Sequence, residues 1–329
     1  MILAGDIGGT KTVCALFEET GGGLQLVRDG TFPSQGHASL EEILTKFLDH
    51  GDKPALRAGC FGVAGAVIDG KCKTTNLPWE LDEVLLARAI KAPRVKLLND
   101  LEAAAYGMLY LRKDELVSLN PDALPPRKGN VAVIAAGTGL GEAMLYWDGQ
   151  KHHPLASEGG HADFAPHTDE QVDLWRWLRA KYGHVSYERI LSGPGFQNVF
   201  MFLRESGRFQ ESPALQEALA GSGDPNIAIT RLGVTGEDDL SVATVDLVCS
   251  IYGAEAGNLA LKCVAVGGVF IGGGIAPKLG VTALKRGRFM EAFTNKGRFS
   301  TLMKGIEVQM ALNPRAPLIG AAHYAAGMH

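Results

Sequence analysis

The sequence has little that would suit a membrane or a nucleic acid. No apolar run reaches the ~20 residues that a membrane-spanning helix needs. The formal net charge is −4 at pH 7, which gives no basic field for nucleic acid. The one basic stretch, residues 285–298, contains Glu291 and is expected to form a solvated helix face. We therefore expect neither a membrane nor a nucleic acid as a partner.

Cysteine is scarce, and its spacing suggests no pairing. The five cysteines are odd in number and irregularly spaced, and no C-x-x-C pair occurs. This pattern argues against a disulfide framework and against a structural zinc site. The N-terminal stretch has no charged leader and is interrupted by Asp6, so we expect no signal peptide. The expected location is the reducing cytoplasm.

Glycine, in contrast, is concentrated in three short segments that each follow an apolar, strand-like run. These segments are residues 5–10 (GDIGGT), 136–141 (AGTGLG) and 272–274 (GGG). Glycines at strand ends allow backbone N–H groups to approach phosphate oxygens closely. We predict that a nucleotide binds these segments, between two halves of the chain. Asp6 is suited to hold a metal ion that neutralises the phosphates.

The remaining pattern predicts an α/β chain that is long enough, at 329 residues, for two domains. Strands are expected over residues 1–4, 12–17, 24–27, 58–63, 95–98, 131–135, 142–147 and 264–271. Helices are expected over residues 39–49, 81–90, 101–111, 214–219, 242–262 and 317–328. A strand–glycine turn–strand unit occurs near the N-terminus and again after a linker at residues 120–128. This repetition indicates a weak internal duplication.

The sequence matches neither of two common nucleotide-binding motifs, the P-loop and the dinucleotide fingerprint. Residues 65–72 nearly match a P-loop, but Cys72 stands where the metal-binding Ser or Thr belongs. Asp69-Gly70 in the same stretch suits a hairpin turn better. The Gly137 turn has Glu142 where a dinucleotide fingerprint needs its third glycine.

Asn99 and Asp100 stand between an expected strand and an expected helix. One interpretation is that Asp100 is only the N-cap of that helix. In open α/β sheets, however, ligands bind at the carboxyl ends of strands. An aspartate there can accept the proton of a substrate hydroxyl as it attacks phosphorus. The two roles are compatible.

Two later segments carry acids and a histidine. Glu158 and His161 flank two glycines, and they could bind a polyhydroxylated ligand or belong to a solvated surface turn. Glu188 precedes the helix breaker Ser-Gly-Pro-Gly at residues 192–195, and taken alone it would be a surface acid. A zinc site is not expected, because no further Cys or His shows ligand spacing nearby.

Together these segments resemble the bacterial glucokinase family, within the sugar-kinase/actin-like ATPase superfamily. The resemblance rests on residues 5–10, 98–100, 136–141, 158–166, 184–195 and 268–275, in this order, and it extends to residues 295–299. It covers close to the whole chain. Its most specific parts are residues 158–166 and 184–195.

The resemblance implies an ATP- and Mg²⁺-dependent kinase that phosphorylates the 6-hydroxyl of glucose. It also implies a ribonuclease H-like fold with a cleft between a small domain (residues 1–111 plus about 312–329) and a large domain (residues 112–311), and a homodimer. Asp100 would be the base, and the sugar would be held by Asn99, Glu158, His161 and Glu188. The nucleotide would be held by Asp6, Gly8, Gly9, Thr10, Lys11, Gly137, Thr138, Gly139, Gly272, Gly273 and Gly274, with Mg²⁺ at Asp6, directly or through water.

Lys11 departs from the pattern, because many of these glucokinases have Asn there. A lysine at this position resembles the related repressor/open-reading-frame/kinase group. That group, however, carries a cysteine-rich zinc motif, and this chain has no cysteine between Cys72 and Cys249. Lys11 would bind a phosphate as a point charge or remain solvated. The alternatives are a related hexose or N-acetylhexosamine kinase, a non-catalytic sugar sensor and a filament-forming ATPase. Asp6 and Asp100 argue against the sensor, since it needs neither a metal anchor nor a base.

Overall fold

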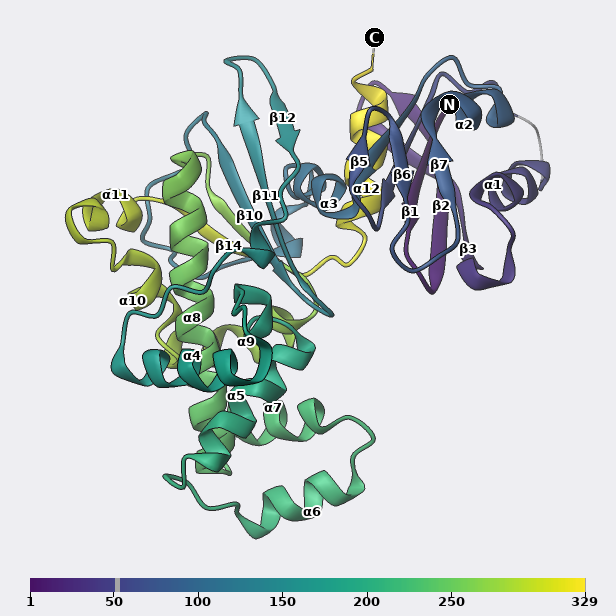
Figure 1. The fold of residues 1–329 in the computed structure, drawn as a ribbon. Helices are drawn as coiled ribbons and strands as arrows, with labels where there is room; N and C mark the ends of the chain where they lie inside the picture. Colours follow the sequence, from purple (N-terminus) through teal and green to yellow (C-terminus); the bar gives the residue numbers. More distant parts are fainter. Residues whose placement is uncertain (51–53, 329) are drawn as a thin grey trace. The chain divides into compact units, whose positions relative to one another are not determined.

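The computed structural model describes residues 1–50 and 54–328, and the chain divides into two compact units (Figure 1). Unit 1 comprises Met1–Arg112, Ala143–Ala156 and the chain from Asn313 onward. Unit 2 comprises Lys113–Glu142 and Ser157–Leu312. Among the described residues, no helix combines the length and apolar character that crossing a bilayer requires.

Unit 1 contains a five-stranded sheet in the order β3-β2-β1-β4-β8. Its strands are β1 (Ile2–Ile7), β2 (Lys11–Thr20), β3 (Gly23–Pro33), β4 (Ala58–Val63) and β8 (Val95–Asn99). β1 pairs antiparallel with β2 and parallel with β4, which pairs parallel with β8. Because parallel strands end at the same edge of a sheet, Asp6 and Asn99 lie at one edge. A separate hairpin sheet holds β5 (Val67–Ile68), β6 (Lys71–Lys73) and β7 (Glu80–Asp82).

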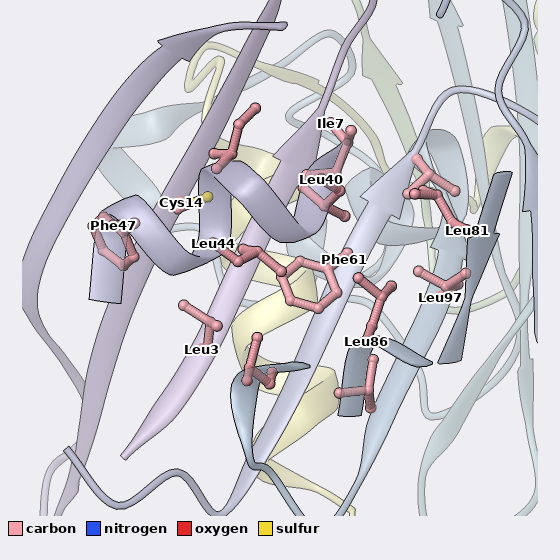
Figure 2. Packing of buried hydrophobic residues seen from close by; sticks show 14 of the residues in the cluster. Leu3, Ile7, Cys14, Leu40, Leu44, Phe47, Phe61, Leu81, Leu86 and Leu97 are labelled. Carbon is pink, nitrogen blue, oxygen red and sulfur yellow. The ribbon is translucent and has the colours of Figure 1, made fainter. Parts of the chain in front are cut away.

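Helices cover both faces of the five-stranded sheet. They are α1 (Leu40–Asp49), α2 (Glu83–Ile90), α3 (Asp100–Met108) and α12 (Ala316–Ala326). Figure 2 shows the first core, in which Leu3 and Ile7 of β1 meet residues of α1 and α2. Ile2 and Ala4, the alternate residues of β1, join α12 and α3 in the second core. A strand that is apolar on both faces is typical of the centre of such a sheet.

The second sheet has the order β12-β11-β10-β13-β14-β9. Its strands are β9 (Leu116–Ser118), β10 (Val131–Ala136), β11 (Leu140–Trp147), β12 (His152–Leu155), β13 (Val269–Gly272) and β14 (Val308–Ala311). The order β12-β11-β10-β13-β14 repeats the order β3-β2-β1-β4-β8 of the first sheet, and β9 is added at one edge. In both sheets the last two strands of the repeat are parallel to the strand before them. This order confirms the predicted internal duplication.

The other helices are α4 (Asp169–Tyr182), α5 (Gly193–Glu205), α6 (Pro213–Gly221), α7 (Pro225–Thr235), α8 (Asp239–Cys263), α9 (Ile275–Arg286), α10 (Phe289–Thr294) and α11 (Ser300–Lys304). Short 3₁₀ turns are η1 (Ser34–Gly36), η2 (Lys113–Glu115), η3 (Gly159–His161), η4 (Tyr187–Arg189) and η5 (Gly297–Phe299). The sequence pattern missed α4, α5, α7 and α9. Of these, α7 starts at an Asp224 N-cap and buries Ile229 and Leu232. The prediction of a solvated helix face over residues 285–298 is wrong. The helix breaks at Gly287, and Phe289 and Phe293 are fully buried.

The hairpin around Asp69-Gly70 is confirmed. Both residues have positive φ, 50° and 72°, which suits the tight turn between β5 and β6. Residues 65–72 are therefore not a P-loop. All five cysteines are free thiols, and four of them are buried.

Candidate active site

The first glycine turn joins β1 to β2 and is held from within the fold. The Gly8 N–H donates to the Lys11 carbonyl at 3.0 Å. The Ser34 hydroxyl donates to the Gly8 carbonyl at 2.7 Å, and the Ser34 N–H donates to the Thr10 carbonyl at 3.0 Å. Thr12 shares a 2.9 Å hydroxyl–hydroxyl bond with Ser34, and both side chains are fully buried. The turn is thus fixed by two residues that sequence reasoning did not select.

Gly9 is required by packing. A Cβ at this position would lie 2.6 Å from the Cβ of Asn76, which is closer than real Cβ atoms come. Thr10 and Lys11 next to it are exposed. The backbone of the turn is therefore pressed against the fold on one side, while Thr10 and Lys11 face solvent.

Asp6, the residue before the last in β1, lies in an environment that disfavours its charge. Burial and the Asp100 carboxylate raise the pKa of Asp6 to about 6, and Lys11 acts in the opposite direction. In the sheet, Asp6 is paired with Gly62, and a Cβ on Gly62 would lie 3.7 Å from the Cα of Asp100. Two carboxylates and one lysine thus act on the same small region of unit 1.

Asn99, and not Asp100, is the N-cap of α3. The Asn99 side chain accepts from the Leu101 N–H at 2.9 Å, and Glu102 accepts from the Asn99 N–H at 2.9 Å. The Asn99 amide also donates to the Gly65 carbonyl at 3.1 Å. The interpretation of Asp100 as a cap is therefore wrong. Asp100 is the exposed first residue of the helix, and its carboxylate also accepts from the Leu101 N–H, at 2.8 Å.

The other two glycine segments lie side by side in unit 2. β10 and β13 are parallel neighbours with Ala135 opposite Gly272, so both segments lie at the same sheet edge. Gly273 has a φ of 79°, and a side chain there would overlap the Ala136 backbone. Tyr252, fully buried on α8, fixes this edge because its hydroxyl accepts from the Ala136 N–H at 3.2 Å and lies 3.4 Å from the Gly272 carbonyl.

Two glycines let the chain between Glu158 and His161 pack onto β11. A side chain at Gly160 would overlap the Leu140 carbonyl, and one at Gly159 would overlap the Glu142 carboxyl. The segment forms the 3₁₀ turn η3, in which the His161 N–H donates to the Glu158 carbonyl at 3.0 Å. The Glu158 side chain is exposed, and that of His161 is 61% exposed.

Glu188 joins the second glycine segment to His161. One of its oxygens accepts from the Leu140 N–H at 2.9 Å, next to Gly139, and the other lies 3.8 Å from His161 Nδ1. Ser192, the N-cap of α5, donates to the Glu188 carbonyl at 2.7 Å. Glu188 is therefore a fixed carboxylate, only 31% exposed, and not a mobile surface acid.

Each unit thus gathers part of the predicted set. Unit 1 brings together Asp6, the Gly8–Lys11 turn, Asn99 and Asp100. Unit 2 brings together Gly137–Gly139, Glu188 and His161, with Gly272–Gly274 on the neighbouring strand. Over residues 1–50 and 54–328, no group of three or more His, Cys, Asp or Glu side chains could hold a metal ion. A cation at Asp6 would need further ligands from phosphate or water.

Comparison with known proteins identifies the family. The glucokinase family profile matches residues 3–328. The glucokinase of Trichormus variabilis is 38% identical over 340 residues, an alignment that covers 99% of each chain. The chain belongs to the glucokinase family.

Solved structures agree with this assignment. A crystal structure of a glucokinase from an Antarctic psychrotroph is 31% identical, with a TM-score of 0.86 over 99% of each chain. The ROK family glucokinase from Streptomyces griseus, solved with glucose and AMPPNP, is 20% identical with a TM-score of 0.65. These similarities confirm the predicted α/β fold of the actin-like sugar kinases. The enzyme is a glucokinase, an ATP-dependent kinase that phosphorylates hexose.

Proposed function

We propose that Asp100 is the general base that accepts the proton of the glucose 6-hydroxyl during transfer of the ATP γ-phosphoryl group. The observation that carries this proposal is the position of Asp100 at the exposed start of α3, where its charge is felt by Asp6. A base needs to reach a substrate hydroxyl, and an exposed carboxylate at the carboxyl end of a strand can do so.

The sugar and nucleotide roles follow the same reasoning. Asn99, Glu158, His161 and Glu188 bind glucose hydroxyls, and the three glycine segments with Thr10, Thr138 and Lys11 bind ATP. The hydrogen bonds that hold Glu188 against Leu140 support its role, because a fixed acceptor orients a sugar better than a mobile one. The Asn99 side chain makes two hydrogen bonds to the backbone, and its second amide hydrogen and second oxygen lone pair bind glucose.

Asp6 suits a Mg²⁺ ion that arrives with ATP. Burial and next the charge of Asp100 raise the pKa of Asp6, and a divalent cation would favour the ionised form of both carboxylates. When bound, the ion neutralises charge on the transferred phosphoryl group. Asp6 would hold it directly or through water, while Lys11 adds a positive charge beside it. Asp100 then accepts the hydroxyl proton, and the sugar-binding side chains keep the hydroxyl in line.

Three further proposals concern the whole protein. The first is a division into a small domain of residues 1–111 plus about 312–329 and a large domain of residues 112–311. The second is a homodimer, which light scattering on the purified protein would test. The third is a cytoplasmic location, which the five free thiols support, because disulfides are rare in that compartment.

The Asp100→Asn variant tests the base. The substitution keeps the size of the side chain but removes its ability to accept a proton. Turnover should therefore fall by about 10²- to 10⁴-fold. Glucose binding, measured by calorimetry, should change little. Asp239→Asn is the matched control, because Asp239 is also the exposed first residue of a helix. Near-normal turnover of Asp100→Asn would show that another group takes the proton.

A further inference from the structure

Two acids are buried against each other beneath the sugar-binding segments of unit 2. Glu142 on β11 is 1% exposed, and Glu255 in the middle of α8 is fully buried. Burial, the Glu255 charge and a hydrogen bond to Glu255 raise the pKa of Glu142, so the two carboxyl groups lie within reach of each other. A hydrogen bond between two carboxyl groups requires a proton on one of them, because an ionised carboxylate only accepts. The pair therefore holds one proton between two oxygens.

The surroundings show which acid is neutral. Glu255 receives the Asn258 amide at 2.8 Å, Lys262 Nζ at 3.3 Å and the Tyr187 hydroxyl. These donors compensate a negative charge on Glu255. Glu142, in contrast, has one buried oxygen, Oε1, with no hydrogen-bond partner among the described residues. Because an ionised carboxylate with an unpartnered buried oxygen is costly, Glu142 carries the proton.

The other titratable groups around the pair do not change this assignment. Lys296 donates to the Asn258 side chain at 2.6 Å and to the Ala254 carbonyl at 2.8 Å, and His167 lies within electrostatic reach of Lys296. Tyr252 is a further titratable neighbour of Glu142 on α8. Burial, and next the Glu255 charge, raise the pKa of Glu142 to about 8, and Lys262 acts in the opposite direction.

The pair touches both segments that carry the predicted sugar ligands. The Glu142 carboxyl lies against Gly159, the residue that follows Glu158 in η3. The Tyr187 hydroxyl, which bonds to Glu255 and Asn258, belongs to the residue before Glu188. A change in the pair would therefore reach Glu158 and Glu188 through their immediate neighbours.

We propose that the protonated Glu142–Glu255 pair is a positioning element of the sugar site, and that loss of its proton displaces η3 and weakens glucose binding. The inference rests on the proposed roles of Glu158 and Glu188. With the proton in place, one neutral and one ionised carboxyl group share a hydrogen bond. This bond holds the Glu142 carboxyl, on which Gly159 packs, in position. Without it, two buried carboxylates repel each other, and the Glu142 carboxyl is pushed toward Gly159, which packs on it.

The sign of the pH effect follows from the direction of the shift. The pKa of Glu142 has its ordinary value of 4.5 in the unfolded chain and rises to about 8 in the folded protein. The stability that the proton provides is complete below about pH 4.5 and is lost as the pH rises through about 8. The fraction of enzyme that binds glucose well should fall over the same upper range.

The test is the dissociation constant for glucose, measured between pH 7 and pH 9. If only the protonated form binds, the constant should rise about tenfold, since the protonated fraction falls from about nine tenths to about one tenth. Glu142→Gln keeps a neutral donor of the same shape, so its glucose binding should be independent of pH in this range. Glu217→Gln, an exposed glutamate on α6, is the control and should follow the wild-type curve.

A second measurement protects the test against misfolding of the variant. Thermal unfolding of the wild-type enzyme without glucose should move to lower temperature from pH 6 to pH 9, and Glu142→Gln should lose this dependence. Glucose binding that is independent of pH in the wild type, or that weakens equally in Glu142→Gln, overturns the inference. If Glu158→Gln leaves glucose binding unchanged at pH 7, the proposed sugar site itself fails, and the inference fails with it.

Discussion

A side chain at position 159 or 160 would overlap β11, which explains why two glycines separate Glu158 from His161. The glycines serve packing, and the packing leaves Glu158 exposed at the start of η3. Backbone requirements of this kind can be guessed from the sequence. The contacts made by Ser34 and Tyr252 cannot, because a hydroxyl that supports a turn from a distant element has no local pattern.

Replacing Glu158 by glutamine should raise the KM for glucose and leave the stability of the fold unchanged. A hydrogen bond to a charged group contributes about 1.5–3 kcal/mol, so the increase should be about tenfold to a hundredfold. The kcat should change much less, because Glu158 is proposed to bind the ring and not the reacting atoms. Steady-state kinetics of Glu158→Gln, with Glu217→Gln as the control, would measure both constants. An unchanged KM would remove Glu158 from the site.

At the scale of elements, the contact between α3 and α12 holds the start of α3 in place. Gly107 lies against the Ala316 carbonyl, and Gly320 lies against the Ala103 carbonyl, so each helix approaches the other through a glycine. Asp100 begins α3, and α12 packs on β1 and β4 in the second core. The C-terminal helix therefore supports the residue that we propose as the base.

The Gly320→Ala variant should destabilise the protein, since its Cβ would overlap the backbone of α3. Overpacking of this kind costs about 1–3 kcal/mol, and the backbone contact places this variant at the upper end. Gly327→Ala is the control, because a Cβ there would meet its nearest atom at 3.5 Å, an ordinary contact. Urea denaturation of both variants would show the difference. Equal stability would mean that the two helices can move apart freely.

The helices α1, α2, α3, α6, α8 and α12 followed from local patterns, whereas α4, α5, α7 and α9 were missed. β4 matched residue for residue, and α1 began one residue after its Ser39 cap. α7 was missed because its surroundings are polar and glycine-rich, although Asp224 and Pro225 form a good helix start. Residues 285–298 were misread because the basic residues hid the buried Phe289 and Phe293. Charge on one side of a short helix conceals an apolar side that a coarse reading overlooks.

At the scale of the whole molecule, the same strand order recurs in two sheets, and a glycine turn follows the matching strands β1 and β10. Sequence comparison established the family and its activity, since the match covers residues 3–328. The buried acid pair was beyond prediction, because Glu142 and Glu255 are far apart in sequence and each stands in an unremarkable local context.

Removing divalent cations should stop turnover but not glucose binding. Asp6 and Asp100 repel each other without a cation, and the phosphates of ATP would add further negative charge. Chelation with EDTA should therefore reduce phosphorylation to background, and excess Mg²⁺ should restore it. Glucose affinity, measured by calorimetry, should stay within about twofold, because the proposed sugar ligands in unit 2 hold no cation. Full activity in EDTA would contradict the role given to Asp6.

The most direct test of the base is a crystal structure of the enzyme with glucose and a non-hydrolysable ATP analogue. The account predicts an oxygen of Asp100 at about 2.6–3.2 Å from the glucose 6-hydroxyl, on the side away from the γ-phosphate. A bound glucose whose 6-hydroxyl faces a different base, with Asp100 turned toward solvent, would contradict it.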